Sequence, residues 1–149
     1  MEFITFGLNI IVYGDTKKNM KDFANPDSYK GKTPLEMTRQ FATVMKQQID
    51  ADWYANGDLE QMRLRLITEE YNEIMQSEDT DNLIKELADL IYVTYGYAAC
   101  FGWDLDEAVR RVHASNMSKL GEDGEPIYRH DGKVLKGPNY MPPDLSDLT

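Results

Sequence analysis

The sequence predicts an all-α protein: an antiparallel four-helix bundle with an extended N-terminal arm and a short C-terminal hairpin and strap. Four segments carry helix-start signals, apolar residues recur at helical spacing within them, and short connections separate them. At 149 residues the chain is long enough for one domain with a hydrophobic core and too short for two of ordinary size. We therefore expect a single domain over residues 1–149, with its helical core at 33–120.

Residues 1–32 are expected to form an arm and a loop. The segment 3–13 is rich in β-branched and aromatic residues, which favours a strand or an extended arm. Residues 17–32 contain Asn25-Pro26 and show no apolar period, which indicates a loop. The apolar N-terminal run lacks a basic leader and a cleavage site and is too short to span a bilayer. We therefore expect a cytoplasmic protein without a membrane partner.

The first helix is predicted over 33–54. Thr33 supplies a capping hydroxyl, Pro34 occupies the first helical position, and Glu36 is placed to complete a capping box. Apolar side chains then recur at every fourth position and predict the stripe that faces the core: Phe41, Met45, Ile49 and Trp53.

Three further helices are expected after it. Asn56-Gly57 interrupts the helical pattern, Asp58 to Gln61 caps the second helix, and Asp104 to Glu107 forms a capping box for the fourth. Gly102 is a stop signal after the third helix, and Cys100, the only cysteine, is predicted to be a buried apolar side chain. The expected spans are 58–77, from 79–81 to about 100, and from 104 to about 119.

Residues 121–149 differ from the helical part in composition. The turn Asp131-Gly132 lies between two short runs of strand-forming residues, and a Pro-rich segment follows. This pattern predicts a small hairpin followed by a strap.

The net charge limits the class of partner. Acidic residues number 26 against 16 basic ones, which gives a formal net charge of −10. Such a charge repels a polyphosphate backbone, so we expect no nucleic-acid polymer as a partner. A small anionic substrate is compatible with it where bound metal ions invert the local field.

Carboxylates interrupt the apolar stripes of two predicted helices. On the second helix, Glu70 and Glu73 continue a row that begins with apolar residues. On the third, Glu86 lies within an apolar row and Asp89 sits one turn along on its flank. A single ExxE sequence is usually a solvated face, but a second pair on the inward side of a neighbouring helix favours a site.

Four carboxylates in one bundle interior repel one another and need a cation. Arg63 and Lys85 are predicted to point away from the stripe, so a divalent metal fits better. Hard oxygen ligands suit Mg²⁺, with Mn²⁺ as a possible substitute. The group contains no His, which argues against zinc and against a di-iron site.

The sequence "EEYNE" at 69–73, twelve further residues and "ELAD" at 86–89 resemble the EExxE…ExxD signature of the MazG-like all-α nucleoside triphosphate pyrophosphohydrolases. The related phosphoribosyl-ATP pyrophosphatases look similar. The segment 112–140 resembles an extension of phage-encoded and bacterial members, and the resemblance covers about 33–145.

This resemblance implies cleavage between the α- and β-phosphates of a nucleotide, which releases a monophosphate and pyrophosphate. It implies two or more Mg²⁺ ions at each site, with a water molecule oriented or deprotonated by Glu69 or Glu73. The ligands that it implies are Glu70, Glu73, Glu86 and Asp89.

Candidate substrate contacts lie outside the acidic group. Asn116 and Lys119 match family positions that meet the nucleotide, although Lys119 also suits a helix C-terminus. Arg129 and Lys133 of the hairpin could close over phosphates or serve solubility. Trp53 could stack on a base, although its place in the apolar stripe favours the core.

The leading hypothesis is a Mg²⁺-dependent (deoxy)nucleoside triphosphate pyrophosphohydrolase, of viral origin and acting in the host cytoplasm, with dGTP as the favoured substrate. A phosphoribosyl-ATP pyrophosphatase and a non-catalytic acidic bundle that binds metal or a partner remain as alternatives. A wide apolar face and the resemblance predict a homodimer or homotetramer.

Overall fold

A computed structural model describes residues 25–149, so the segment 3–13, predicted as a strand or arm, lies outside the described residues. The chain divides into two units, residues 1–31 and residues 32–149. In the first, the described part contains the short 3-10 helix η1 (Pro26–Ser28). The second contains α2 (Pro34–Val44), the 3-10 turn η2 (Trp53–Ala55), α3 (Gly57–Gln76), α4 (Thr80–Phe101) and α5 (Leu105–Met117).

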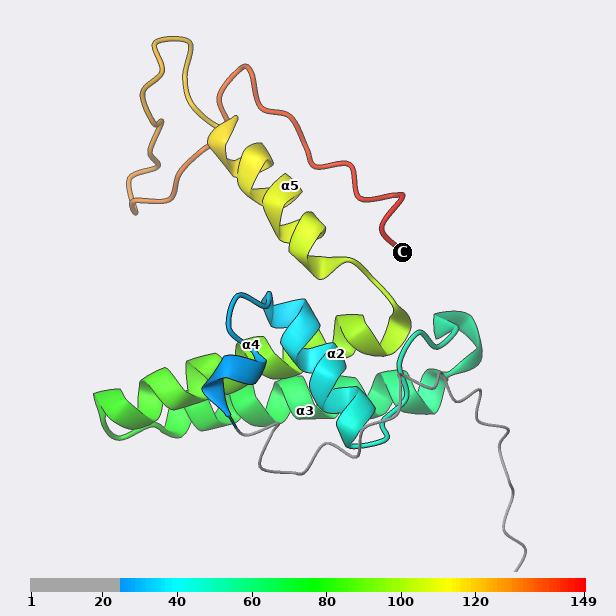
Figure 1. Ribbon diagram of the computed structural model, residues 1–149. Helices are drawn as coiled ribbons and strands as arrows, with labels where there is room; N and C mark the ends of the chain where they lie inside the picture. Colours follow the sequence, from blue (N-terminus) through cyan, green and yellow to red (C-terminus); the bar gives the residue numbers. More distant parts are fainter. Residues whose placement is uncertain (1–24) are drawn as a thin grey trace, which may run out of the picture. The chain divides into compact units, whose positions relative to one another are not determined.

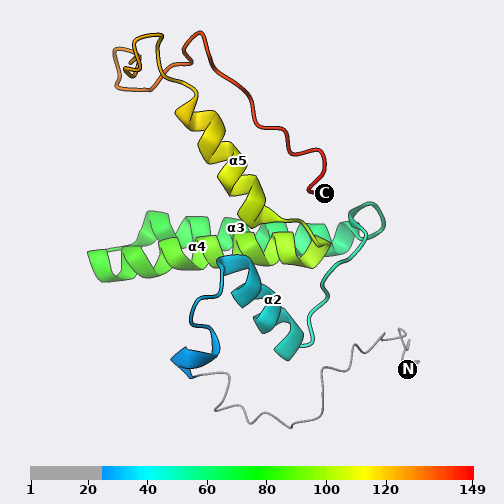
Figure 2. The same ribbon diagram turned by 45° about the horizontal axis from the view of Figure 1, so that its top comes forward.

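The predicted all-α class with four helices is confirmed for the described residues, in which no strand is present. Helices α3 and α4 are joined by residues 77–79 and lie side by side as an antiparallel hairpin (Figures 1 and 2). Helix α2 packs against α4, and α5 contacts α2 while extending away from the α3–α4 hairpin. In this part of the chain, none of the helices combines the length and apolar character needed to cross a membrane.

Helix α2 begins as predicted but ends earlier. The Thr33 hydroxyl accepts from the Glu36 N–H at 3.3 Å, and the Glu36 carboxylate accepts from the Thr33 N–H at 2.7 Å, which completes the capping box. The helix stops at Val44 rather than Tyr54. The predicted stripe of Phe41, Met45, Ile49 and Trp53 is therefore wrong as a single helical face, and Phe41 and Met45 are exposed.

The early end of α2 has a backbone cause and a tertiary cause. Lys46 and Asp50 have φ angles of 55° and 54°, a left-handed conformation that an α-helix cannot contain. The Arg39 guanidinium holds the Asp50 carboxylate through two contacts of 2.7 Å. The N–H groups of Asp50 and Ala51 then donate to the carbonyls at the end of α4. These two backbone N–H groups are therefore satisfied by carbonyls of α4 rather than by hydrogen bonds within a longer α2.

The other three helices follow their predicted spans to within a few residues. Asp79 caps α4 by accepting from the Asn82 N–H at 2.8 Å, and Asp104 caps α5 by accepting from the Glu107 N–H at 2.9 Å. Helix α4 ends at Phe101, and Gly102, with a φ of 76°, supplies the left-handed C-cap. The predicted capping of α3 by Asp58 is wrong, because α3 begins at Gly57 behind Asn56, which makes no side-chain capping bond.

Four of the five buried apolar residues in the described part of the chain lie at the carboxyl end of α4. Phe101 lies 5.4 Å from Tyr97 and 5.3 Å from Trp103 between ring centroids. Cys100 is fully buried, as predicted. The buried apolar residues in the described part of the chain are Ala42, Ala98, Ala99, Cys100 and Phe101.

The C-terminal segment forms the predicted hairpin and strap. An antiparallel bridge pairs Tyr128 with Val134, and Gly132 adopts a φ of 84° in the turn between them. The strap runs back alongside α5 (Figure 1), where the Ser115 hydroxyl donates to the Met141 carbonyl at 2.7 Å. Arg111 of α5 also donates to the Asp147 carboxylate.

Candidate metal and nucleotide site

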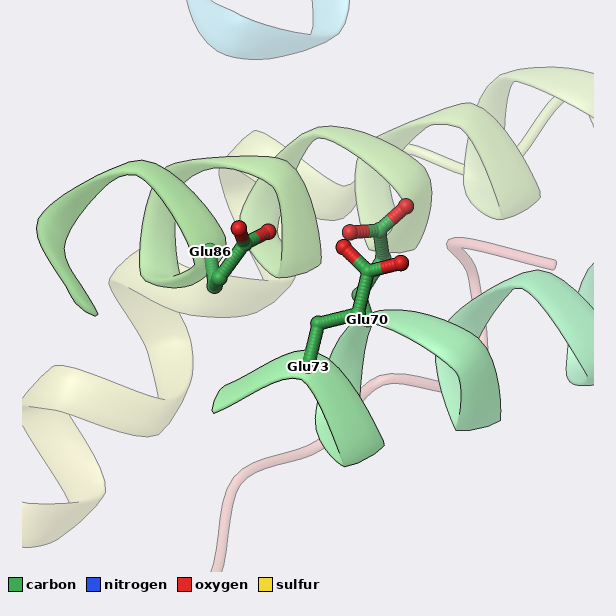
Figure 3. A group of neighbouring side chains, drawn as sticks. All are labelled: Glu70, Glu73 and Glu86. Atoms are coloured by element: carbon green, nitrogen blue, oxygen red, sulfur yellow. The ribbon is translucent and has the colours of Figure 1, made fainter. Parts of the chain in front are cut away.

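Three carboxylates from two helices converge at one place. Glu70 and Glu73 lie one turn apart on α3, and Glu86 faces them from the antiparallel α4 (Figure 3). One carboxylate oxygen from each lies within 4.8 Å of the other two. Glu86 is buried with 4% of its surface exposed, Glu70 is half-buried, and Glu73 is exposed. We call these three residues the glutamate cluster.

The proximity of these groups raises two of their pKa values. Burial raises the pKa of Glu70, and the neighbouring carboxylates of Glu73, Asp89 and Glu86 raise it further. The pKa of Glu73 is raised because its carboxyl hydrogen-bonds to Glu86 and because the Glu86 charge repels its ionised form. Both shifts show that the cluster favours added positive charge, whether a proton or a cation.

Glu86 is held differently, by donors on its own helix. The Lys85 ammonium contacts both Glu86 oxygens at 3.0 Å, and the Asn82 amide donates to Oε1 at 2.7 Å. The hydrogen bond from Lys85 is the main reason that the pKa of Glu86 is lowered. The prediction that Lys85 points away is therefore wrong, because its long side chain curls back over α4.

Asp89 lies beside the glutamate cluster and is not one of its three members. Its carboxylate accepts from Lys85 at 2.9 Å and is 44% exposed. Its charge nevertheless contributes to the raised pKa of Glu70, so it lies within electrostatic reach of α3. Asn82, which the sequence reasoning missed, stands four residues before Glu86, and Lys85, whose direction it predicted wrongly, stands four residues before Asp89. This spacing pairs side chains on a helix surface.

Arg63 also departs from its predicted orientation. It lies seven residues before Glu70 on α3 and is buried, with 6% of its surface exposed. Its guanidinium donates to the Gln47 side-chain carbonyl at 3.3 Å, and its Nε has no partner in the described part of the chain. The closeness of Nη1 to Gly96 places this cation between α3 and α4. The prediction that Arg63 points away from the apolar stripe is therefore wrong, because its guanidinium is buried.

Glu69 stands next to the glutamate cluster on the exposed side of α3. Its charge contributes to the raised pKa of Glu73, so the two carboxylates lie within electrostatic reach of each other. Glu69 is therefore positioned beside the cluster, where it can meet water.

The predicted substrate contacts lie on other elements. Asn116 is exposed near the end of α5, and Lys119 is half-buried just beyond it. Arg129 pairs with Asp131 across the hairpin turn, with Nε and Oδ1 2.9 Å apart, and Lys133 is exposed. In residues 25–149, no hydrogen bond or ion pair joins these four side chains to the glutamate cluster.

Trp53 lies in η2 and not on a helical core stripe. Its ring packs edge-on against Tyr54, with centroids 5.1 Å apart, and its Nε1 is buried without a hydrogen-bond partner among the described residues. This indole therefore carries an unused donor beside the start of α3.

The donor set of the glutamate cluster fits a hard divalent cation. It consists of carboxylate oxygens, with no His or Cys in the group. The Glu86 charge repels the ionised form of Glu73 and contributes to its raised pKa, and a bound cation would relieve this repulsion. The cluster could therefore hold a metal ion.

Comparison with known families gives one match that spans the helices of this site. The family described as phosphoribosyl-ATP pyrophosphohydrolase matches residues 38–116, more than half of the chain. The matched region runs from α2 to α5 and contains the glutamate cluster and Asp89. A search of curated proteins finds no match. The extent of the family match shows that this chain belongs to the phosphoribosyl-ATP pyrophosphohydrolase family.

Proposed function

We propose that the protein is a Mg²⁺-dependent (deoxy)nucleoside triphosphate pyrophosphohydrolase that yields a nucleoside monophosphate and pyrophosphate. The observation that carries the proposal is the glutamate cluster, formed by two antiparallel helices in a chain of a pyrophosphohydrolase family. A polyphosphate substrate and an acidic protein repel each other unless a cation lies between them, and the glutamate cluster is suited to hold such a cation.

The proposed roles follow from position and exposure. Glu70, Glu73 and Glu86 would hold the metal, and Asp89 would join them once it leaves Lys85. When bound, Mg²⁺ neutralises charge on phosphate oxygens and acidifies water. Glu69 or the exposed Glu73 would orient the attacking water and accept its proton. The water oxygen bonds to the α-phosphorus while the bond from this phosphorus to the oxygen that bridges the α- and β-phosphates breaks. Pyrophosphate leaves with that bridging oxygen.

The substrate contacts are proposed on the remaining residues. Lys119 and Lys133 supply cations for phosphate oxygens, and Asn116 supplies an amide near the end of α5. Arg129 would exchange Asp131 for a phosphate. Trp53 offers a ring face for a base. Purine deoxynucleotides, dGTP first, are the proposed substrates.

A substrate panel with product identification tests the proposal. The protein is incubated with Mg²⁺ and each deoxynucleoside triphosphate, and monophosphate and pyrophosphate are measured. We expect both products in equal amounts and a loss of turnover in Glu86→Gln. Release of orthophosphate alone would refute cleavage between the α- and β-phosphates.

Phosphoribosyl-ATP is the second candidate substrate, favoured by the description of the matched family. It belongs in the same panel because the chemistry of the cleaved bond is shared. Turnover of phosphoribosyl-ATP with indifference to deoxynucleotides would select it. Metal binding without turnover of any compound would instead indicate a non-catalytic acidic bundle.

We also propose a homodimer or homotetramer. Large apolar side chains stay exposed on α4, where Ile84, Leu87 and Ile91 share one face, and Val109 and Val112 are exposed on α5. Association would remove this surface from water. Light scattering coupled to size-exclusion chromatography measures the mass directly, and a monomer at micromolar concentration would contradict this proposal.

A further inference from the structure

The Lys85 ammonium already serves as a cation for two of the proposed metal ligands. It lies 3.0 Å from each Glu86 oxygen and 2.9 Å from Asp89 Oδ2. Asn82 donates to the same Glu86 oxygen, Oε1, that Lys85 contacts. Both oxygens of the buried Glu86 carboxylate are therefore engaged by donors from α4 itself.

These contacts conflict with metal binding at the same oxygens. Glu86 is buried, and the Lys85 ammonium that contacts both of its oxygens would strongly repel a divalent cation close to them. A divalent ion that takes Glu86 and Asp89 as ligands therefore competes with the Lys85 ammonium for these carboxylates. The Lys85 side chain is 61% exposed, so it can move into water with its charge solvated.

We propose that Lys85 is a displaceable internal counter-ion that competes with the divalent metal for Glu86 and Asp89 and thereby sets the metal affinity of the site. The inference rests on the metal site of the proposed function and does not depend on turnover. Without the metal, Lys85 neutralises the buried Glu86 carboxylate. With the metal, the ion takes over this role and the ammonium is released.

An ordinary surface ion pair would behave differently. Exposed pairs contribute little, and removing one partner leaves other sites unaffected. Lys85 instead contacts a carboxylate whose side chain is only 5% exposed. The competition therefore predicts tighter metal binding when the ammonium is removed, the opposite of what a residue that shapes the site would show.

Metal titration of Lys85→Met tests the competition. Methionine keeps much of the side-chain length and apolar stem but has no charge. Mn²⁺ binding to chelator-treated protein is measured by the loss of the free-ion electron paramagnetic resonance signal. We expect the Kd for Mn²⁺ to fall by roughly 10-fold, within the usual range of coupling between two ligands. Lys46→Met, an exposed lysine after α2, should leave the Kd unchanged.

A second measurement uses the wild-type protein, so it does not depend on how the variant folds. The rate of acetylation at Lys85 is followed by mass spectrometry of peptides with and without saturating Mn²⁺. We expect the rate at Lys85 to rise several-fold with metal while the rate at Lys46 stays constant. An unchanged Lys85 rate, or an unchanged or weaker Mn²⁺ Kd in Lys85→Met, would overturn the inference.

The inference and the proposed function fail in distinguishable ways. Turnover of nucleotides by the wild type, together with an unchanged Kd in Lys85→Met, removes the inference alone. Tighter Mn²⁺ binding in Lys85→Met with no turnover of any nucleotide removes the proposed function alone. Absence of Mn²⁺ binding by both proteins overturns both.

Discussion

Glu70→Gln should change protein stability in opposite directions with and without metal. The pKa of Glu70 is raised in the folded state, so the folded carboxyl binds its proton more tightly than the unfolded one. The stabilisation that this tighter proton binding gives the fold is therefore fully present below about pH 4.5, the ordinary pKa of a glutamate. It is lost as the pH rises through the pKa of Glu70 in the folded state. An uncharged glutamine at position 70 is not repelled by the carboxylates of Glu73, Asp89 and Glu86. At pH 7.5, chelator-treated Glu70→Gln should therefore melt at or above the wild-type temperature.

Metal should reverse the order of the two melting temperatures, because the wild type binds the ion more tightly than Glu70→Gln does. A metal at 100 times its Kd stabilises the folded state by about 2.7 kcal/mol, and a 100-fold loss of affinity reduces this to about 0.4 kcal/mol. For a chain of 149 residues, the larger value corresponds to a rise in Tm of roughly 5–10 °C. The variant lacks one of the three converging carboxylates, whose oxygens lie within 4.8 Å of one another. It should show only a small part of this rise.

Thermal unfolding followed by circular dichroism measures both effects, with Mg²⁺ or with chelator at pH 7.5. Glu78→Gln, in the exposed connection between α3 and α4, is the matched control and should follow the wild type in both conditions. The reasoning is refuted if Glu70→Gln retains the full Mg²⁺-dependent rise in Tm. It is also refuted if the chelator-treated variant melts well below the wild type, because Glu70 would then have a stabilising partner.

Three further outcomes test separate parts of the structure. Arg63→Met should be neutral or up to about 2 kcal/mol more stable in urea unfolding, because it removes a buried cation with an unpaired Nε; a loss of 3 kcal/mol or more would reveal an anionic partner. Asp147→Asn should lower Tm at pH 7, and its difference from the wild type should shrink as the pH falls below 3.8, because the Arg111 guanidinium lowers the pKa of Asp147 and the stabilising contribution is lost as the pH falls through the folded value. Gly102→Ala should destabilise the fold by about 1–2 kcal/mol, since its φ is 76° and a Cβ would lie 3.0 Å from the Asp50 carboxylate; an unchanged midpoint of urea unfolding would contradict this strain.

Local signals predicted most of the helical architecture. The capping box of Thr33 and Glu36 forms as predicted, because it depends on residues only three positions apart. Of the capping box predicted at Asp104 and Glu107, only the Asp104 cap forms, because the Glu107 carboxylate accepts from Arg110 and Arg111 instead. Helical periodicity also placed Glu70, Glu73 and Glu86 on facing sides of an antiparallel pair, where their oxygens converge. These features need no knowledge of distant residues, because sequence spacing sets helix caps and helix faces directly.

The sequence alone determined the all-α class, the starts of α2, α4 and α5, and the three glutamates that meet between α3 and α4. The tertiary structure decided where α2 ends, because carbonyls of α4 satisfy the N–H groups of Asp50 and Ala51. It also decided where the charged ends of two cationic side chains lie, since helical periodicity gives the direction of a Cβ but not the path of a long side chain. Lys85 curls back onto Glu86, and Arg63 lies buried beside Gly96.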